Sequence, residues 1–226
     1  MNTCEDKEAA FFGKITAGIT HELKNVLAII RESSGLMGDI ISISPEAVVK
    51  HQEKIQNSMV RIKEQIERGV NLTDRLNRFA HSTDETLSKI DLQETVEQLI
   101  ILAQRFARLK HIVLKTVTPD QEGPAVTLVT RHVQLQMALF ESLECCFTVM
   151  SAGGEINIGI HNLDGTNAVH VVCKGDLPEQ SEFSRKILES KNWPVLQEIV
   201  ACLQGSANLD EIEHGIVLCF PDEIGR

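Results

Sequence analysis

The stretch that decides the fold is ITAGITHELKNVLAII, residues 15–30. Apolar side chains recur through this stretch and just beyond it, at Ile15, Ile19, Val26, Ile30 and Met37. Successive positions are four or seven residues apart, and each step of seven is one step of four plus one of three. This heptad spacing predicts a long helix over residues 10–41, with one face packed against another helix. Glu22 and Ser33 occupy two intervening positions of the same stripe, so the expected core face carries an acid and a hydroxyl.

A second long helix is expected over residues 45–80. Ser44 is a good N-cap, and Pro45 is a good first helical residue. Its stripe again follows four–three steps, at Ile55, Met59, Ile62, Ile66, Gly69, Thr73 and Leu76. Two long helices with a short connection form an antiparallel hairpin, and two hairpins from two chains would form a four-helix bundle. We therefore expect a homodimer. The alternative is a monomer whose hairpin packs on its own second domain.

The pattern changes after residue 80. The polar segment 81–89 is typical of a linker, and the capping-box pair Asp91 and Glu94 then opens a helix. Helices are expected over 91–111, 131–150, 179–190 and 193–204, and strands over 112–118, 125–130, 155–162 and 168–175. A turn is expected at 164–165, and a closing hairpin turns at His214–Gly215. The predicted fold class is α + α/β, a helical hairpin followed by an α/β domain.

Composition narrows the function. The formal net charge is −10, which disfavours nucleic acid and anionic membrane as partners. No apolar run approaches the length of a membrane span. The six cysteines form no CxxC pair and mostly lie in apolar runs, which is typical of reduced thiols in a cytoplasmic protein.

The helix over residues 10–41 also carries a chemical pattern. A helical histidine can accept a phosphoryl group on one ring nitrogen, and Glu22, next to His21, is placed to stabilise the ring or to act as a base. Asn25 lies one turn beyond His21 and could orient an attacking water, while Lys24 could contribute positive charge. A structural histidine at the edge of an apolar stripe is the plain alternative. A zinc protease is disfavoured, because the second histidine of HExxH is replaced by Asn25.

The segment GKITAGITHELKNVLAII resembles the phosphoacceptor box of bacterial two-component sensor histidine kinases, with His21 at the acceptor position, Glu22 as the following acid and Asn25 as the phosphatase amide. The similarity continues through KIDLQETVEQLI, RHVQLQMALFESLECC, GGEINIGI, VVCKGD and GIVLCFP, and covers residues 10–221. It implies a dimerisation and histidine-phosphotransfer hairpin over 10–81. A histidine-kinase-type ATPase-like α/β sandwich would follow over 88–226.

The nucleotide positions of that family are not kept. Glu141 and Cys145 align with its two motif asparagines, and Cys173 stands where an adenine-reading aspartate belongs. Leu177 stands where that family has a glycine, and in this loop only Gly175 matches the family's pattern. The glycine-rich lid is replaced by LESKNWP, and a phosphate cradle made from backbone N–H groups is not expected without those glycines.

An acceptor histidine without a nucleotide site resembles the histidine phosphotransferases of bacterial phosphorelays. The resemblance implies signal transduction through a phosphohistidine at His21, which accepts and donates a phosphoryl group between the aspartates of response-regulator receiver domains. No cofactor is expected, and Mg²⁺ would belong to the receiver. Three alternatives stay open: an active histidine kinase with a divergent ATP site, a non-catalytic kinase-like scaffold or inhibitor, and a receiver phosphatase that uses Asn25.

Overall fold

The computed structural model describes residues 4–82, 85–117, 126–163, 166–210 and 212–225. The chain folds as two compact units. One unit is Lys14–Ala80, and the other joins the chain from His81 onward with the first turns of the N-terminal helix, up to Gly13.

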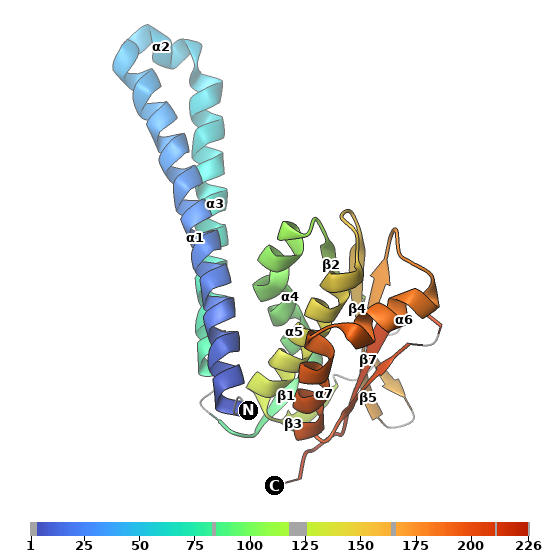
Figure 1. The fold of residues 1–226 in the computed structure, drawn as a ribbon. Coiled ribbons are helices and arrows are strands. Elements are labelled where there is room, and N and C mark those ends of the chain that lie inside the picture. Colours follow the sequence, from blue (N-terminus) through green and yellow to red (C-terminus); the bar gives the residue numbers. More distant parts are fainter. Residues whose placement is uncertain (1–3, 83–84, 118–125, 164–165, 211, 226) are drawn as a thin grey trace. The chain divides into compact units, whose positions relative to one another are not determined.

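The unit Lys14–Ala80 is a helical hairpin (Figure 1). It is built from α1 (Cys4–Ile43), the short α2 (Pro45–Lys50) and α3 (Gln52–His81). Helix α2 begins at Pro45, as expected from the Ser44–Pro45 signal, but the single predicted second helix is interrupted at His51. Helix α1 continues to Ile43 through Gly35 and Gly38, because the cost of glycine in a helix is small beside the packing of a long stripe.

Most of the predicted inward stripe of α1 is buried, while Ile30 and Met37 are half-buried. Ile15, Ile19 and Val26 are buried, and so are the two polar members, Glu22 and Ser33. The helices approach closely at Gly69 of α3, where an added Cβ would come within 3.3 Å of Cγ1 of Val26. Gly69 therefore lets the two backbones come together at this level of the hairpin.

Within a single chain, the predicted stripe of α3 is only partly covered. Met59 and Ile66 are 59% and 51% exposed, whereas Ser58 and Leu72 are buried. Helix α3 has two adjacent apolar faces, and one partner helix covers only one of them. Met59, Ile66 and Val70, which is 56% exposed, make up the uncovered face. We call these three residues the open face of α3.

The second unit contains a five-stranded sheet in the order β2-β4-β5-β7-β6. Its strands are β2 (Val113–Val117), β4 (Glu155–Leu163), β5 (Thr166–Lys174), β6 (Ser206–Leu209) and β7 (Gly215–Phe220). Strands β2 and β4 are parallel and the other pairs are antiparallel. The predicted turn at 164–165 lies outside the described residues, but the flanking pair Leu163 and Thr166 is in register.

Four helices cover one face of this sheet (Figure 1): α4 (Leu92–Leu109), α5 (His132–Val149), α6 (Gln180–Glu189) and α7 (Asn192–Cys202). Helix α5 is buried along most of its length and contacts the other three helices. The covered face of the sheet is apolar, as at Ile156, Val171 and Leu218. This layer of helices on a mixed sheet confirms the predicted α/β class for the second unit.

The predicted linker over 81–89 contains an additional strand. Strand β1 (Ser88–Asp91) pairs antiparallel with β3 (Thr127–Thr130) to form a separate two-stranded sheet. Asp91 then caps α4, because its Oδ1 accepts from the backbone N–H of Glu94 at 3.0 Å. The cap was predictable from the capping box. The strand was not, because four residues carry too little periodicity.

The first turns of α1 belong to the second unit, although residues 10–13 were expected in the hairpin. Phe11 is buried, with its ring centroid 5.5 Å from that of Phe140 on α5. Nε2 of Gln134 donates to Oε1 of Glu8 at 3.1 Å. An aromatic contact and a hydrogen bond therefore attach this segment to α5.

Candidate functional site

The sequence pattern His21–Glu22–Asn25 lies in the middle of α1, within the hairpin. The side chains of His21 and Asn25 are exposed and lie one turn apart on the same face of the helix. Lys24 is exposed as well. An exposed imidazole with an exposed amide beside it can be reached by a docking protein, which a phosphoacceptor requires.

Glu22 points elsewhere. Its side chain is 7% exposed, and its Oε2 accepts a hydrogen bond from Nη2 of Arg68 on α3 at 2.6 Å. Arg68 itself is 39% exposed, so the pair runs from the hairpin interior toward solvent. The contact expected from the sequence was between Glu22 and the His21 ring. The contact present is with Arg68, and the role of Glu22 toward His21 stays a prediction.

Arg68 was not identified from the sequence. It is separated from Glu22 by 46 residues, and their contact depends on how the two helices are aligned. One signal was present. A buried acid at a core-spaced position requires a cation, and Arg68 directly precedes Gly69, a member of the opposing stripe.

The aligned nucleotide positions of the second unit contain buried thiols. Cys145 and Cys146 on α5 and Cys173 on β5 are all buried. A hydrogen bond to the Cys173 thiol, together with burial, raises the pKa of Cys146 well above its ordinary range. Burial and the nearby Glu141 carboxylate raise the pKa of Cys145 to about 12. Neutral thiols in a core are poor ligands for Mg²⁺, which prefers oxygen.

Gly175, the one glycine that matches the related family, has a local structural role. Its φ is +130°, in a region that other residues rarely adopt. An added Cβ would also come within 3.1 Å of Cα of Gly154. The close approach of these two backbones is sufficient to require glycine at this position.

The segment that replaces the glycine-rich lid is folded. LESKNWP joins the end of α6 to the start of α7, and Phe183, Ile187 and Leu196 of these two helices are fully buried. These side chains attach both helices to the rest of the unit, while the residues of LESKNWP itself are half-buried or exposed.

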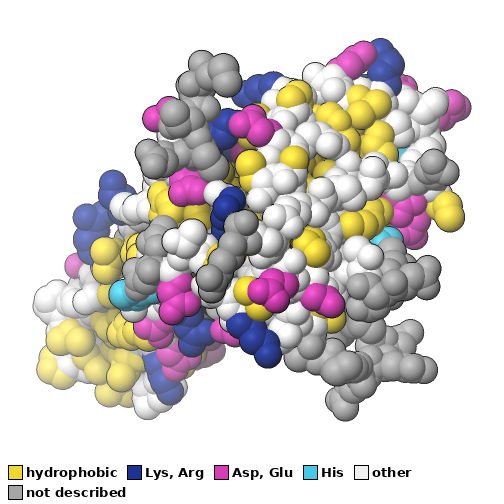
Figure 2. Space-filling view, turned by 90° about the horizontal axis from the view of Figure 1, so that it is seen from below, with side chains coloured by type: hydrophobic (Ala, Val, Ile, Leu, Met, Phe, Trp, Pro, Cys, Tyr) yellow, Lys and Arg dark blue, Asp and Glu magenta, His cyan; other side chains and the backbone are white. Residues whose placement is uncertain are grey.

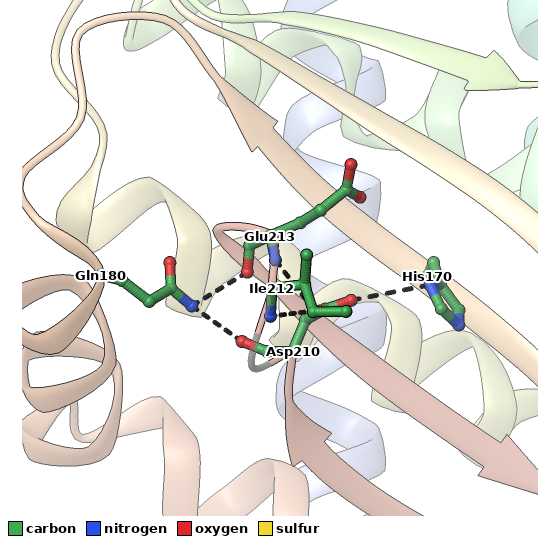
Figure 3. A network of polar contacts seen from close by, with 5 residues as sticks. All are labelled: His170, Gln180, Asp210, Ile212 and Glu213. Atoms are coloured by element: carbon green, nitrogen blue, oxygen red, sulfur yellow. Dashed lines mark hydrogen bonds and ion pairs between the residues drawn. The ribbon is translucent and has the colours of Figure 1, made fainter.

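A polar network ties the start of α6 to the turn between β6 and β7 (Figure 3). Oδ1 of Asp210 accepts from the backbone N–H groups of Ile212 and Glu213, at 2.8 and 2.9 Å. Nε2 of Gln180 donates to the carbonyl oxygens of Asp210 and Glu213, at 2.8 and 3.1 Å. Nδ1 of His170 lies 3.9 Å from Oδ2 of Asp210. The network fixes the start of α6 against the β6–β7 turn.

Within the described ranges, no cluster of three or more His, Cys, Asp or Glu side chains is placed to hold a metal ion. Among the described helices, none is both long and apolar enough to cross a membrane. On the face in Figure 2, acidic and basic side chains are interspersed with hydrophobic ones.

Comparisons with known proteins gave similarities of structure. The sequence matches no known family and no curated protein. The catalytic domain of histidine kinase ThkA aligns at 16% identity over 62% of this chain and 100% of its own, with a TM-score of 0.49. Histidine kinase ThkA in complex with response regulator protein TrrA aligns at 16% identity, over 94% of this chain and 61% of its own, with a TM-score of 0.46. A bacterial phosphotransferase aligns at 12% identity over 97% of both chains, with a TM-score of 0.47. These scores and identities are low, so the functional assignment rests on the residues of this chain.

Proposed function

We propose that this chain is a histidine phosphotransferase of a two-component phosphorelay. His21 would accept a phosphoryl group from the aspartate of one response-regulator receiver domain and donate it to the aspartate of another. The observation that carries the proposal is the exposed pair His21 and Asn25 on a helical hairpin, joined to an α/β unit with buried thiols at the aligned nucleotide positions.

The chemistry needs little from this chain. The neutral imidazole attacks the phosphorus of an aspartyl phosphate in line. One N–P bond forms, one O–P bond breaks, and the receiver carboxylate leaves. Return transfer reverses these steps. The receiver's own Mg²⁺ would neutralise the phosphoryl charge, so the proposal assigns no cofactor to this chain.

The second unit supports a role without ATP. Cys145 and Cys173 stand where a kinase of the similar family would use an amide and an aspartate, and both thiols are buried. The lid segment joins two packed helices. We propose that this unit serves as part of the docking surface for the receiver.

A homodimer is part of the proposal. The open face of α3 presents three apolar side chains to solvent, each more than half exposed. An open hollow of about 400 Å³ lies beside Ile66 and Val70, lined by α3 residues as far as Arg78. A second copy of the hairpin would cover this face in a four-helix bundle and bury apolar surface on both chains.

Receiver dephosphorylation is a second candidate activity, favoured by the exposure of Asn25 beside His21. An amide at that position could orient a water against the aspartyl phosphate. Both activities would use the same docked complex.

The test uses the purified 226-residue chain with a receiver domain that has been phosphorylated from a labelled small phosphodonor. Transfer to this chain, absent in His21→Ala, is the expected result. Incubation with labelled MgATP is the parallel arm, and label at His21 from ATP would indicate a working kinase instead.

A further inference from the structure

The acid next to the candidate acceptor raises an electrostatic question. An aspartyl phosphate is anionic, and a carboxylate beside the attacking imidazole would repel it as it approaches. Glu22 directly follows His21, so a solvent-facing Glu22 would place its negative charge close to the reacting atoms.

The hairpin keeps that charge inside. Glu22 occupies a core-spaced position of α1 and its side chain is 7% exposed, whereas His21 is exposed. Nη2 of Arg68 donates to the Glu22 carboxylate at 2.6 Å, which is short even for a charge-assisted hydrogen bond. A buried carboxylate is costly unless it is paired, and Arg68 supplies a positively charged partner for Glu22.

We infer that Arg68 is a positioning residue for phosphoryl transfer, because it holds the Glu22 carboxylate in the hairpin interior, away from His21 and the incoming phosphoryl group. This inference rests on the proposed function at His21. It differs from the role expected from the sequence, in which Glu22 stabilises the His21 ring directly. The effects of removing Arg68 and of neutralising Glu22 distinguish this role from direct stabilisation of the His21 ring by Glu22.

Removing Arg68 leaves a carboxylate buried without this cation. We expect the Glu22 carboxylate then to turn toward solvent, where its place next to His21 on α1 brings its charge closer to the imidazole. Replacing Glu22 by glutamine removes the charge but keeps an oxygen that can accept from Arg68. A Glu22→Gln substitution in the Arg68→Met background should therefore restore what Arg68→Met loses.

The experiment measures single-turnover transfer from a phosphorylated receiver domain at saturating and half-saturating receiver. The variants are Arg68→Met, Glu22→Gln and their double, with Arg61→Met, an exposed arginine of the same helix, as the matched control. We expect Arg68→Met to slow transfer at saturation by about tenfold, the effect of one misplaced charge. We expect that deficit to shrink as salt is raised, since salt screens exposed charges. The double variant should transfer at the rate of Glu22→Gln, because Arg68 then has no carboxylate to hold in place.

Two results would overturn the inference. If the double variant is as slow as Arg68→Met and salt has no effect, Arg68 acts only on stability. If Glu22→Gln alone is slow, Glu22 acts on the reaction itself.

The Glu22–Arg68 pairing can also be measured without phosphoryl transfer. An absent pairing can therefore be distinguished from an absent phosphotransferase activity. The ¹³C carboxyl resonance of Glu22 should move in Arg68→Met and stay in Arg61→Met. An unchanged resonance in Arg68→Met would refute the pairing. If the resonance moves but the unsubstituted protein takes no phosphoryl group at His21, the proposed function fails and the structural pair stands.

Discussion

Glu22 and Arg68 meet across the helical hairpin, with Nη2 of the arginine 2.6 Å from Oε2 of the glutamate. Because α1 turns Glu22 inward at this level, His21, the preceding residue in the chain, faces outward. The same rotation of the helix exposes Asn25 one turn further on. The Glu22–Arg68 ion pair therefore lies at the level of the hairpin where His21 and Asn25, the two residues on which the proposed function depends, are exposed.

We expect Asn25 to affect the lifetime of the aspartyl phosphate on the receiver and not the stability of this chain. Since its side chain is exposed, Asn25→Ala should change the free energy of unfolding by less than about 0.5 kcal/mol. If the amide orients water, the variant should lengthen the lifetime of a phosphorylated receiver mixed with this protein, measured by loss of label. Asn57→Ala, an exposed asparagine on α3, is the control. Equal lifetimes for the two variants would remove Asn25 from the proposed phosphatase activity.

The open face of α3 should form the dimer contact. Ile66→Glu places a charge on a face that is buried only in a dimer, so it should raise the dimer dissociation constant at least about tenfold, the equivalent of 1.4 kcal/mol. Leu188→Glu on α6 is a matched control, because Ile66 and Leu188 are both 51% exposed. Sedimentation equilibrium measures the effect. A monomeric parent protein, or equal behaviour of the two variants, would contradict the four-helix bundle.

The buried thiols should resist alkylation. Burial and the charge of Glu141 raise the pKa of Cys145 to about 12, so almost no thiolate is present at neutral or mildly alkaline pH. Cys202 is exposed and should react with iodoacetamide much faster. Peptide mapping after timed labelling gives the rate at each cysteine. In denaturant the two rates should converge. Rapid alkylation of Cys145 in the folded protein would mean that the thiol core is open.

His170 should make stability depend on pH. Burial and the neighbouring His161 lower the pKa of His170 from 6.5, although Asp210 and Glu213 oppose the change. Folding therefore favours the neutral imidazole. Its contribution is complete above pH 6.5 and is lost as pH falls from there through the folded pKa, because the unfolded chain then binds the proton first.

The measurement is urea unfolding between about pH 5 and pH 8, the range in which histidines titrate. We expect the free energy of unfolding to fall on the acid side, and His170→Gln to flatten that dependence. His81→Gln, at an exposed histidine at the end of α3, is the control. A pH profile that is the same with and without His170 would show that other groups are responsible.

Much of the fold was predictable because long helices repeat their signals. The four–three steps identified α1 and its inward face, including the buried Glu22 and Ser33. On α3 the same steps crossed from the covered face to the open face, because apolar residues occupy both. Periodicity reports that a face is apolar, and it does not report which apolar face the same chain covers.

The candidate site was predictable only in its local part. His21 and Asn25 belong to one helical turn, and their common exposed face follows from helix geometry. Arg68 enters the site from another helix, and β1 pairs with a strand more than thirty residues away in the chain. Contacts of this kind depend on tertiary alignment, which a single sequence does not encode in any local pattern.

The central claim is transfer through His21, and one measurement tests it most directly. A receiver domain carrying a labelled aspartyl phosphate is mixed with the 226-residue chain, and the label is located by peptide mapping under conditions that preserve phosphohistidine. The account predicts acid-labile label on the peptide that contains His21, no label in His21→Ala, and full label in His51→Ala. Label that persists in His21→Ala, or label that reaches His21 from MgATP without a receiver, would contradict it.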